Sequence, residues 1–306
     1  MIRSIVVWLL TATAMAAAAA ACPFCGPVTR SLASRRDAAD EVLIGSATGT
    51  ATREDDGLTV QPLAAVADLR GTPGGTSVLP TDVIECRVTE PIAGTGILFG
   101  STGPDGMRWE AIPADEALIA HVAAAPAVEE PAARRLRWFA GRLEHANAAI
   151  AADAFTEFGL APFEAVREVA DAFDPGRLET WLDCDWIDQR RRGFYGLALG
   201  LTIRDADATL AAAGTAALRA AIESPGDDLR AGYDGMLAGV LVAEDEAGLG
   251  YLRDRGLFTA TTRPGDARHA LSALRFAWEC LAGTIPRDRI AEATAGLLDN
   301  PAVAAD

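Results

Sequence analysis

The sequence is poor in the residues and motifs that mark catalytic and metal-binding sites. Its three histidines, His121, His145 and His269, are far apart and lack the spacing of metal ligands. We expect them on helix surfaces. No serine stands in a Gly-x-Ser-x-Gly elbow, and the glycine-rich stretch 71–75 lacks the lysine of a phosphate-binding loop. These absences predict that the chain is not an enzyme and binds no metal or cofactor.

The sequence has far fewer basic than acidic residues. The 306 residues include 27 Lys and Arg against 43 Asp and Glu, which gives a net charge of −16. A charge of this sign repels phosphate backbones, so we expect no nucleic acid partner. Hydrophobic residues make up 50% of the chain, enough to bury a core, and the length predicts two domains.

Long hydrophobic runs are also missing. After residue 21 no stretch approaches the roughly 18 to 20 uninterrupted apolar residues of a transmembrane helix. The first 21 residues instead follow the pattern of a signal peptide, with Arg3, an apolar stretch at 5–10 and an alanine run at 16–21. We therefore expect an exported, periplasmic or extracellular protein without a transmembrane span.

Cys22 directly follows the predicted cleavage zone, as the cysteine of a lipoprotein does. The three preceding residues are Ala19, Ala20 and Ala21, whereas a lipobox usually begins with Leu or another large aliphatic residue. Ordinary cleavage is therefore the favoured interpretation, and a lipid anchor at Cys22 is the alternative.

The five cysteines all follow the signal peptide, where export would permit disulfides. The odd number leaves at least one unpaired in a monomer. We expect a bridge among Cys22, Cys25 and Cys86, and an inert buried thiol at Cys280, which lies in an apolar helical run. The Cys-x-x-Cys pair has no strand before it and no histidine after it, which argues against redox and haem-binding roles.

Residues 22–125 are expected to form a small β-rich domain. Strand-forming residues alternate with glycine-rich breakers, and this spacing suits a barrel or a sandwich. A helix at 114–125 and a linker at 126–131 should follow. The five predicted strands are Glu41–Ile44, Leu58–Val60, Val83–Val88, Gly96–Phe99 and Arg108–Ile112.

From residue 132 to 306 the apolar residues recur every three or four positions, which predicts core-facing helices. Asp174 and Pro175 should begin one helix, and Asn300 and Pro301 should close the last.

These helices contain an internal repeat. Phe155, Phe194 and Tyr233 are 39 residues apart (194 − 155 and 233 − 194), each beside small residues that would let neighbouring helices approach. A fourth, shifted copy at 274–281 lacks the glycines, as a terminal capping repeat would. A period near 40 with two helices per unit resembles the HEAT and armadillo α-solenoids; an irregular helical bundle is the alternative.

The N-terminal part also resembles a known family. Cys22-Pro-Phe-Cys25, the segment Ala39–Gly45 and the later strand Ile97–Gly100 are similar to the netrin-like domain of tissue inhibitors of metalloproteinases. The resemblance implies a five-stranded OB-type barrel, and a Cys22 whose free amine could chelate a protease zinc. Only Cys86 is left as a distant disulfide partner, which departs from the family pattern. The whole chain resembles exported bacterial proteins of no assigned function that open with CPFC and end in helical repeats.

The most charged cluster is Asp183–Arg192, with acids before a predicted helix and bases just inside it. A helix cap with ion pairs explains this pattern, and a binding groove carried by Arg190, Arg191 and Arg192 is the alternative. The repeat without catalytic chemistry predicts a non-enzymatic interaction or scaffold protein whose helical surface binds an unidentified protein partner. The rival function is metalloprotease inhibition through Cys22.

Overall fold

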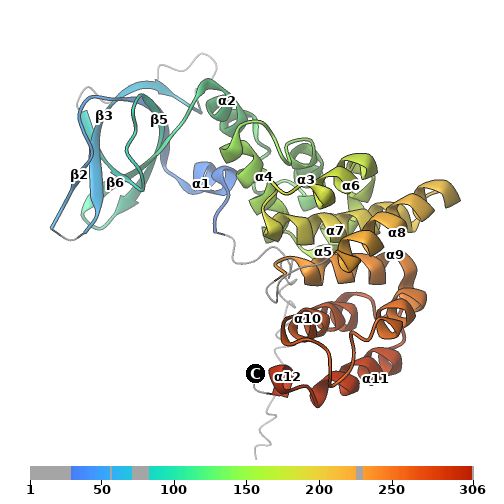
Figure 1. Ribbon diagram of the computed structural model, residues 1–306. Coiled ribbons are helices and arrows are strands. Elements are labelled where there is room, and N and C mark those ends of the chain that lie inside the picture. The colour runs from blue at the N-terminus through green and yellow to red at the C-terminus, as the bar shows by residue number, and fades with distance from the viewer. Residues whose placement is uncertain (1–28, 56, 71–82, 225–229, 305–306) are drawn as a thin grey trace, which may run out of the picture.

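The chain folds into a closed five-stranded β-barrel followed by an array of α-helices, an α+β architecture in two parts (Figure 1). The computed structural model describes residues 29–55, 57–70, 83–224 and 230–304. The predicted signal peptide, Cys22 and Cys25 lie outside the described residues. The barrel stands at one end of the molecule, and the array extends away from it toward the C-terminus (Figure 1).

All five predicted strands are present, as β1, β3, β4, β5 and β6. A short strand, β2, extends the sheet beyond β3. The bounds are β1 (Glu41–Ala47), β2 (Thr52–Arg53), β3 (Thr59–Asp68), β4 (Val83–Val88), β5 (Thr95–Gly103) and β6 (Gly106–Pro113). The barrel order is β1-β3-β4-β6-β5, and β5 pairs back onto β1. Only the β4–β6 pair is parallel among these pairings. This connectivity is that of an OB-like barrel.

Alternating side chains fill the barrel. Along β4 the residues Ile84, Cys86 and Val88 are buried while their neighbours are exposed, because successive strand residues point to opposite faces. Strand β5 is buried on both faces. Its Leu98 belongs to the barrel interior, whereas Phe99 packs outside the barrel in the cluster that includes helical residues. One outer face of the barrel therefore serves as a packing surface for helices.

Two helices join the barrel to the array. Helix α1 (Leu32–Ala38), absent from the sequence prediction, is capped by the Ser31 side chain, and α2 (Glu116–Ala124) lies within the helix expected at 114–125. The buried Arg36 of α1 donates hydrogen bonds to the carbonyl oxygens of Val122 (2.8 Å) and Ala125 (2.6 Å). A buried charge compensated in this way fixes α1 against α2.

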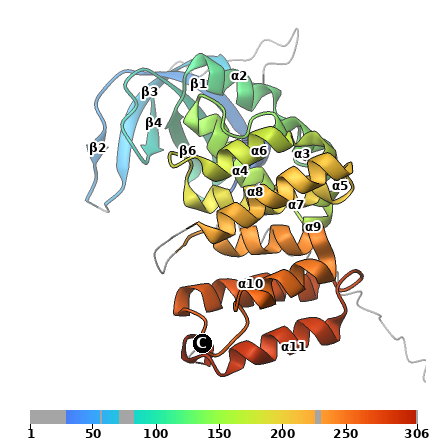
Figure 2. The same ribbon diagram turned by 45° about the vertical axis from the view of Figure 1, so that its right-hand side comes forward.

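The array runs from residue 132 to residue 304. Its helices are α3 (Ala132–Ala140), α4 (Ala148–Leu160), α5 (Phe163–Glu168), the 3-10 helix η1 (Ala170–Ala172), α6 (Pro175–Asp183), α7 (Gln189–Arg204), α8 (Ala208–Glu223), α9 (Tyr233–Asp254), α10 (Pro264–Cys280), α11 (Arg287–Leu298) and α12 (Pro301–Ala304). In both views α10 and α11 lie side by side at its end (Figure 2). None of the described helices is both long and apolar enough to cross a lipid bilayer.

The repeated aromatic positions fall on three helices in the expected order. Phe155 lies on α4, Phe194 on α7 and Tyr233 at the start of α9. The rings of Phe155 and Phe194 meet edge to face with their centroids 5.9 Å apart. The small residues act as predicted between α7 and α9. A Cβ placed on Gly200 would overlap the backbone of Gly239, so these two helices touch through their main chains.

Helix α9 is kinked at Asp245, whose backbone is not helical (φ 52°, ψ −125°). Arg204, at the end of α7, holds the kink by donating to the Asp245 carboxylate and to the carbonyl oxygen of Val242, each at 3.0 Å. Because of the kink, α9 supplies two successive helical segments without an intervening loop.

Two helices that are far apart in the chain meet within the array. Phe163 at the start of α5 meets Phe276 of α10 edge to face, with 4.9 Å between the ring centroids. A small cavity of about 380 Å³ lies where α5, α7, α9 and the end of α10 converge, lined by residues that include Leu201 and Leu281. One continuous hydrophobic cluster runs from α3 to α12. The array fits the α-solenoid description expected from the repeat, with an added contact between helices that are not neighbours in the chain.

Two sequence predictions about the last helices need correction. Asn300 and Pro301 do not close the last helix: α11 ends at Leu298, and Pro301 begins α12. Asn300 is buried and donates to the carbonyl oxygen of Thr262 at 2.8 Å, so it ties the end of the chain to the loop before α10. Cys280 is half-buried at the end of α10, not fully buried as expected.

Candidate interaction groove

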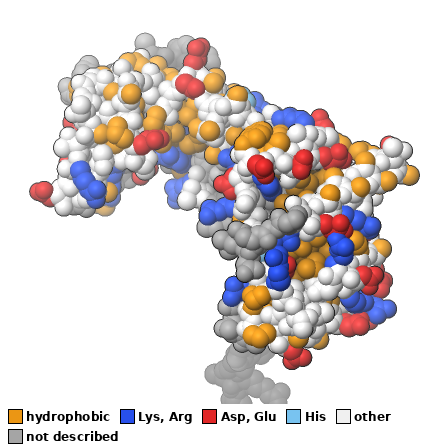
Figure 3. Space-filling model, viewed as in Figure 1, with side chains coloured by type: hydrophobic (Ala, Val, Ile, Leu, Met, Phe, Trp, Pro, Cys, Tyr) orange, Lys and Arg blue, Asp and Glu red, His pale blue; other side chains and the backbone are white. Residues whose placement is uncertain are grey.

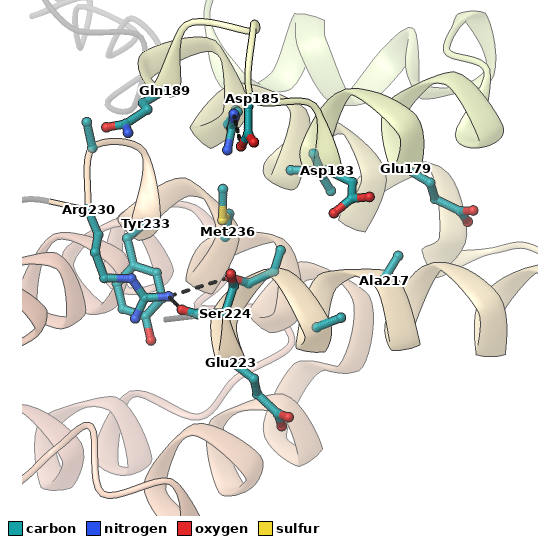
Figure 4. A pocket seen from close by; sticks show the side chains of 15 residues that line it. Glu179, Asp183, Asp185, Gln189, Ala217, Glu223, Ser224, Arg230, Tyr233 and Met236 are labelled. Atoms are coloured by element: carbon teal, nitrogen blue, oxygen red, sulfur yellow. Dashed lines mark hydrogen bonds and ion pairs between the residues drawn. The ribbon is translucent and has the colours of Figure 1, made fainter. Parts of the chain in front are cut away.

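A groove of about 890 Å³ opens between α6 and α8 and is bounded by the first residues of α7 and α9 (Figure 4). We call it the α6/α8 groove. Glu179 and Asp183 of α6 lie along one wall, Ala217 of α8 faces them, and Arg230 and Tyr233 lie at the other end (Figure 4). Charged side chains are much more frequent over the helical part than over the barrel on the face shown in Figure 3.

The wall formed by α6 follows from its sequence. Asp174 caps the helix by accepting hydrogen bonds from the backbone N–H groups of Gly176 (3.0 Å) and Arg177 (3.2 Å), as predicted, and Pro175 occupies the first turn. Leu178, Trp181 and Leu182 are buried against the array. Glu179 and Asp183 are left at the groove. They are four residues apart and therefore lie on one helix face.

The floor formed by α8 is made of small side chains. Leu218 and Ile222 turn into the core, whereas Ala217, Ala220 and Ala221 line the groove. Alanine at these positions leaves the space between α6 and α8 unfilled, so the groove follows from the amphipathic pattern of α8. The exposed surface of this floor is apolar.

The predicted cap and ion pairs of the cluster 183–192 are present. Asp188 caps α7 by accepting from the backbone N–H of Arg190 at 2.9 Å. The three arginines that were predicted as an interaction surface have different surroundings. Arg190 is exposed, whereas Arg191 turns away and pairs with Glu144 at 3.0 Å. Only Arg192 lines the groove, where it donates to the carbonyl oxygen of Cys184 and lies 3.5 Å from the Asp185 carboxylate.

Glu144 also accepts a hydrogen bond from the Tyr195 hydroxyl at 2.6 Å. Burial and the neighbouring carboxylate raise the pKa of Tyr195, so its hydroxyl stays protonated as a donor. Tyr195 in turn packs on Trp181, with ring centroids 4.8 Å apart. Arg191 and Tyr195 therefore fix α7 against the loop before α4 and have a structural role.

Arg230 closes one end of the groove. Its guanidinium donates to the carbonyl oxygens of Ile222 (2.7 Å) and Ser224 (3.1 Å) at the end of α8. It also lies 3.7 Å from Asp266 and stacks 3.7 Å above the Tyr233 ring. These cationic contacts complement the C-terminal end of the α8 dipole and tie α8 to α9 and α10.

Trp186 is the most exposed large hydrophobic side chain among the described residues, at 72%. It belongs to the loop between α6 and α7, between the groove-lining residues Asp185 and Gln189. Tryptophan is enriched among the few interface residues whose truncation costs about 2 kcal/mol or more, and it is enriched at protein-binding sites. The sequence prediction missed Trp186, although a tryptophan in the polar run Asp185-Trp186-Ile187-Asp188 is a usable signal.

The three histidines lie in separate surroundings in the described part of the chain. His121 is buried, contrary to the surface position expected from the sequence, and its Nε2 donates to Asp153 at 2.9 Å between α2 and α4. His145 accepts from the backbone N–H of Asn147 at 3.0 Å, and His269 lies 3.6 Å from Asp234. The described residues contain no group of three or more His, Cys, Asp and Glu side chains placed to hold a metal ion.

Cys86 lies inside the barrel with no exposed surface, and it forms no disulfide with another described cysteine. Burial raises its pKa to about 12, which leaves the thiol protonated and unreactive at neutral pH. The predicted bridge among Cys22, Cys25 and Cys86 stays a prediction, because Cys22 and Cys25 lie outside the described residues.

A comparison of this chain with family models, curated proteins and solved structures found no match.

Proposed function

We propose that this chain is an exported, non-enzymatic interaction protein that binds a protein partner in the α6/α8 groove. The observation that carries the proposal is Trp186, 72% exposed, in the loop that adjoins a groove of about 890 Å³. Protein interfaces are enriched in tryptophan near their centres, where its burial contributes much of the binding energy. A groove floored by alanine gives such a partner access to apolar surface.

The size and openness of the groove favour a polypeptide over a small molecule. Pockets for small ligands enclose most of the ligand surface within apolar and aromatic walls. Here the walls are formed by charged side chains and the floor by alanines, so a small apolar ligand would gain little.

The proposal is tested by capturing the partner with two matched tryptophan variants. Immobilised wild-type protein, Trp186→Ala and Trp278→Ala are each incubated with an envelope extract of the producing cells, and a retained protein is identified and then titrated in purified form. Trp278 is 43% exposed on α10 and stacks with Arg287, far along the chain from the groove. We expect Trp186→Ala to weaken binding at least about tenfold and Trp278→Ala to leave it unchanged. Equal binding by all three proteins would refute the groove as the interaction site.

The barrel supports a second candidate function. We propose as the alternative that the barrel is a netrin-like domain that inhibits a metalloprotease through Cys22, because its strand order is that of the OB-type barrels to which the netrin-like domains belong. The array would then be a HEAT-like scaffold that orients the barrel.

Intact-mass and N-terminal analysis of the mature protein tests the proposed inhibition through Cys22. Inhibition needs an unmodified Cys22 at the first position, so an acylated Cys22 or a preceding alanine would eliminate it. The same spectrum, recorded with and without reductant, detects the predicted disulfide.

A further inference from the structure

The charges of the α6/α8 groove are not equivalent, because its arginines are already neutralised within the fold. Arg230 is surrounded by two backbone carbonyl oxygens, Asp266 and the Tyr233 ring. Arg192 donates to the Cys184 carbonyl oxygen and faces Asp185. A ligand carboxylate or phosphate would have to displace these internal partners. The groove is therefore a poor anion site.

Two carboxylates of the α6 wall, unlike these arginines, are not neutralised within the fold. In the part of the chain that the structure describes, neither Glu179 nor Asp183 forms an ion pair or a side-chain hydrogen bond, and both line the groove. Asp185 continues this wall, and its side chain is fully exposed although it lies 3.5 Å from Arg192. Figure 4 shows the carboxylates of Glu179 and Asp183 on the groove side of α6. These carboxylates can therefore pair with cationic side chains of a partner.

The spacing of these carboxylates fits an extended peptide. Residues four apart on a helix are separated by about 6 Å along its axis. In an extended chain, alternate side chains point to the same side and repeat every ~6.6 Å. Two basic side chains separated by one residue can therefore face Glu179 and Asp183 at the same time.

Two further features of the groove suit lysine and arginine side chains. Their aliphatic stems can lie on the alanine floor formed by Ala217, Ala220 and Ala221 while their charged ends reach the carboxylates. Trp186, in the adjoining loop, offers an indole face to a cation, and tryptophan is the most favourable aromatic residue for this interaction.

We infer that the occupant of the α6/α8 groove is an extended protein segment in which Arg or Lys alternates with small residues. This inference rests on the proposed function and specifies the chemistry of its partner. The groove has the carboxylate spacing and the apolar floor that such a segment needs, and the adjoining loop carries the exposed indole of Trp186. The net charge of −16 adds a long-range attraction that accelerates its association.

The test uses a defined probe, the fluorescein-labelled peptide Gly-Arg-Gly-Arg-Gly-Arg-Gly, and its analogue with glutamate in place of each arginine. Because the whole protein is acidic, a cationic peptide will also be attracted without a specific site, so the position of the charge must be varied at constant net charge. The double variant Glu179→Gln/Asp183→Asn removes two carboxylates from the groove. The control Glu85→Gln/Glu90→Gln removes two exposed carboxylates from the barrel.

Fluorescence anisotropy should show binding of the arginine peptide to the wild type and none of the glutamate peptide. We expect the groove double variant to bind about tenfold more weakly and the barrel control to bind within about twofold of the wild type. Trp186→Ala should weaken binding as well, and circular dichroism confirms that each variant is folded. An equal loss in the two double variants would show that only the overall charge attracts the peptide, and would overturn the inference.

The partner captured in the Trp186 experiment separates the two proposals. If capture depends on Trp186 but the bound segment carries no Arg or Lys pair, the occupant inferred here is wrong and the interaction function stands. If capture is indifferent to Trp186, the proposed function itself fails.

Discussion

The α7–α9 contact and the α6/α8 groove show how residue size decides how closely neighbouring helices of one array pack. Between α7 and α9, glycines bring the two backbones into contact, and an added Cβ at Gly200 or Gly239 would overlap the opposing main chain. Between α6 and α8, charged side chains on one helix face alanines on the other, and a groove of about 890 Å³ remains. Close packing of the kind seen between α7 and α9 fixes the fold. The α6/α8 groove leaves space for another chain to bind.

The largest expected effect on stability comes from adding one methyl group to the glycine contact between α7 and α9. In Gly239→Ala the new Cβ overlaps the carbonyl group of Gly196, so α7 and α9 must separate. We expect a loss of about 2 to 3 kcal/mol in the free energy of unfolding, measured by urea denaturation. Gly250→Ala is the matched control, because it lies in the same helix with nothing within 4 Å of its Cβ. It should gain about 0.5 to 1 kcal/mol. Equal effects of the two changes would show that the glycine contact does not limit the packing.

A smaller effect is expected on the other side of α7, where packing depends on a polar contact. Tyr195→Phe removes the hydrogen bond to Glu144 and keeps the ring on Trp181. Glu144 retains its ion pair with Arg191, so the cost should be about 1 to 2 kcal/mol. Thermal denaturation followed by circular dichroism measures it. A variant as stable as the wild type would mean that the Glu144 pairing contributes nothing to the docking of α7.

A side chain much larger than the methyl group of Gly239→Ala should be tolerated in the groove. Ala220 is exposed on α8 and lines the α6/α8 groove. We expect Ala220→Phe to change the free energy of unfolding by less than about 0.5 kcal/mol, because the ring enters open space. The same variant should block binding of the arginine peptide. A strong destabilisation by Ala220→Phe would show that the α6/α8 groove is as closely packed as the α7–α9 contact.

The smallest effect on stability is expected for the groove carboxylates. Glu179 and Asp183 have no ion-pair partner among the described residues, so Glu179→Gln/Asp183→Asn should alter the free energy of unfolding by only a few tenths of a kcal/mol. Its sign should be favourable, because the substitution reduces the self-repulsion of an acidic protein. A loss greater than that of Tyr195→Phe would assign these residues a structural role.

Local sequence signals were sufficient for the strands, for the cap at Asp174 and for a helix cap within the cluster 183–192, because each depends on residues close together in the chain. The glycine contact between α7 and α9 was predictable from the 39-residue repeat instead. Helix α1 was missed because its stability comes from the distant carbonyl groups that receive Arg36. The kink at Asp245 was missed because it contains no proline, and a distant arginine, Arg204, holds it. Tertiary contacts overrode local propensity in both cases.

The candidate site was only partly predictable. The charged cluster 183–192 indicated the correct segment, and Arg192 does line the groove. The separate surroundings of Arg190 and Arg191 depend on Glu144, which lies 47 residues from Arg191 in the sequence. The groove itself depends on the distance between α6 and α8, which no local pattern contains. The unpaired carboxylates could therefore be recognised only after the packing was known.

The contact between Phe163 and Phe276 changes how the array should lose its structure. In an open repeat protein each unit touches only its neighbours, so terminal units fray and unfolding can proceed in stages. Here α5 also touches α10, which is not its neighbour in the chain, and both belong to one core, so α10 cannot detach without uncovering Phe163. Loss of α10 should therefore also weaken the packing of α5, a helix far ahead of it in the chain.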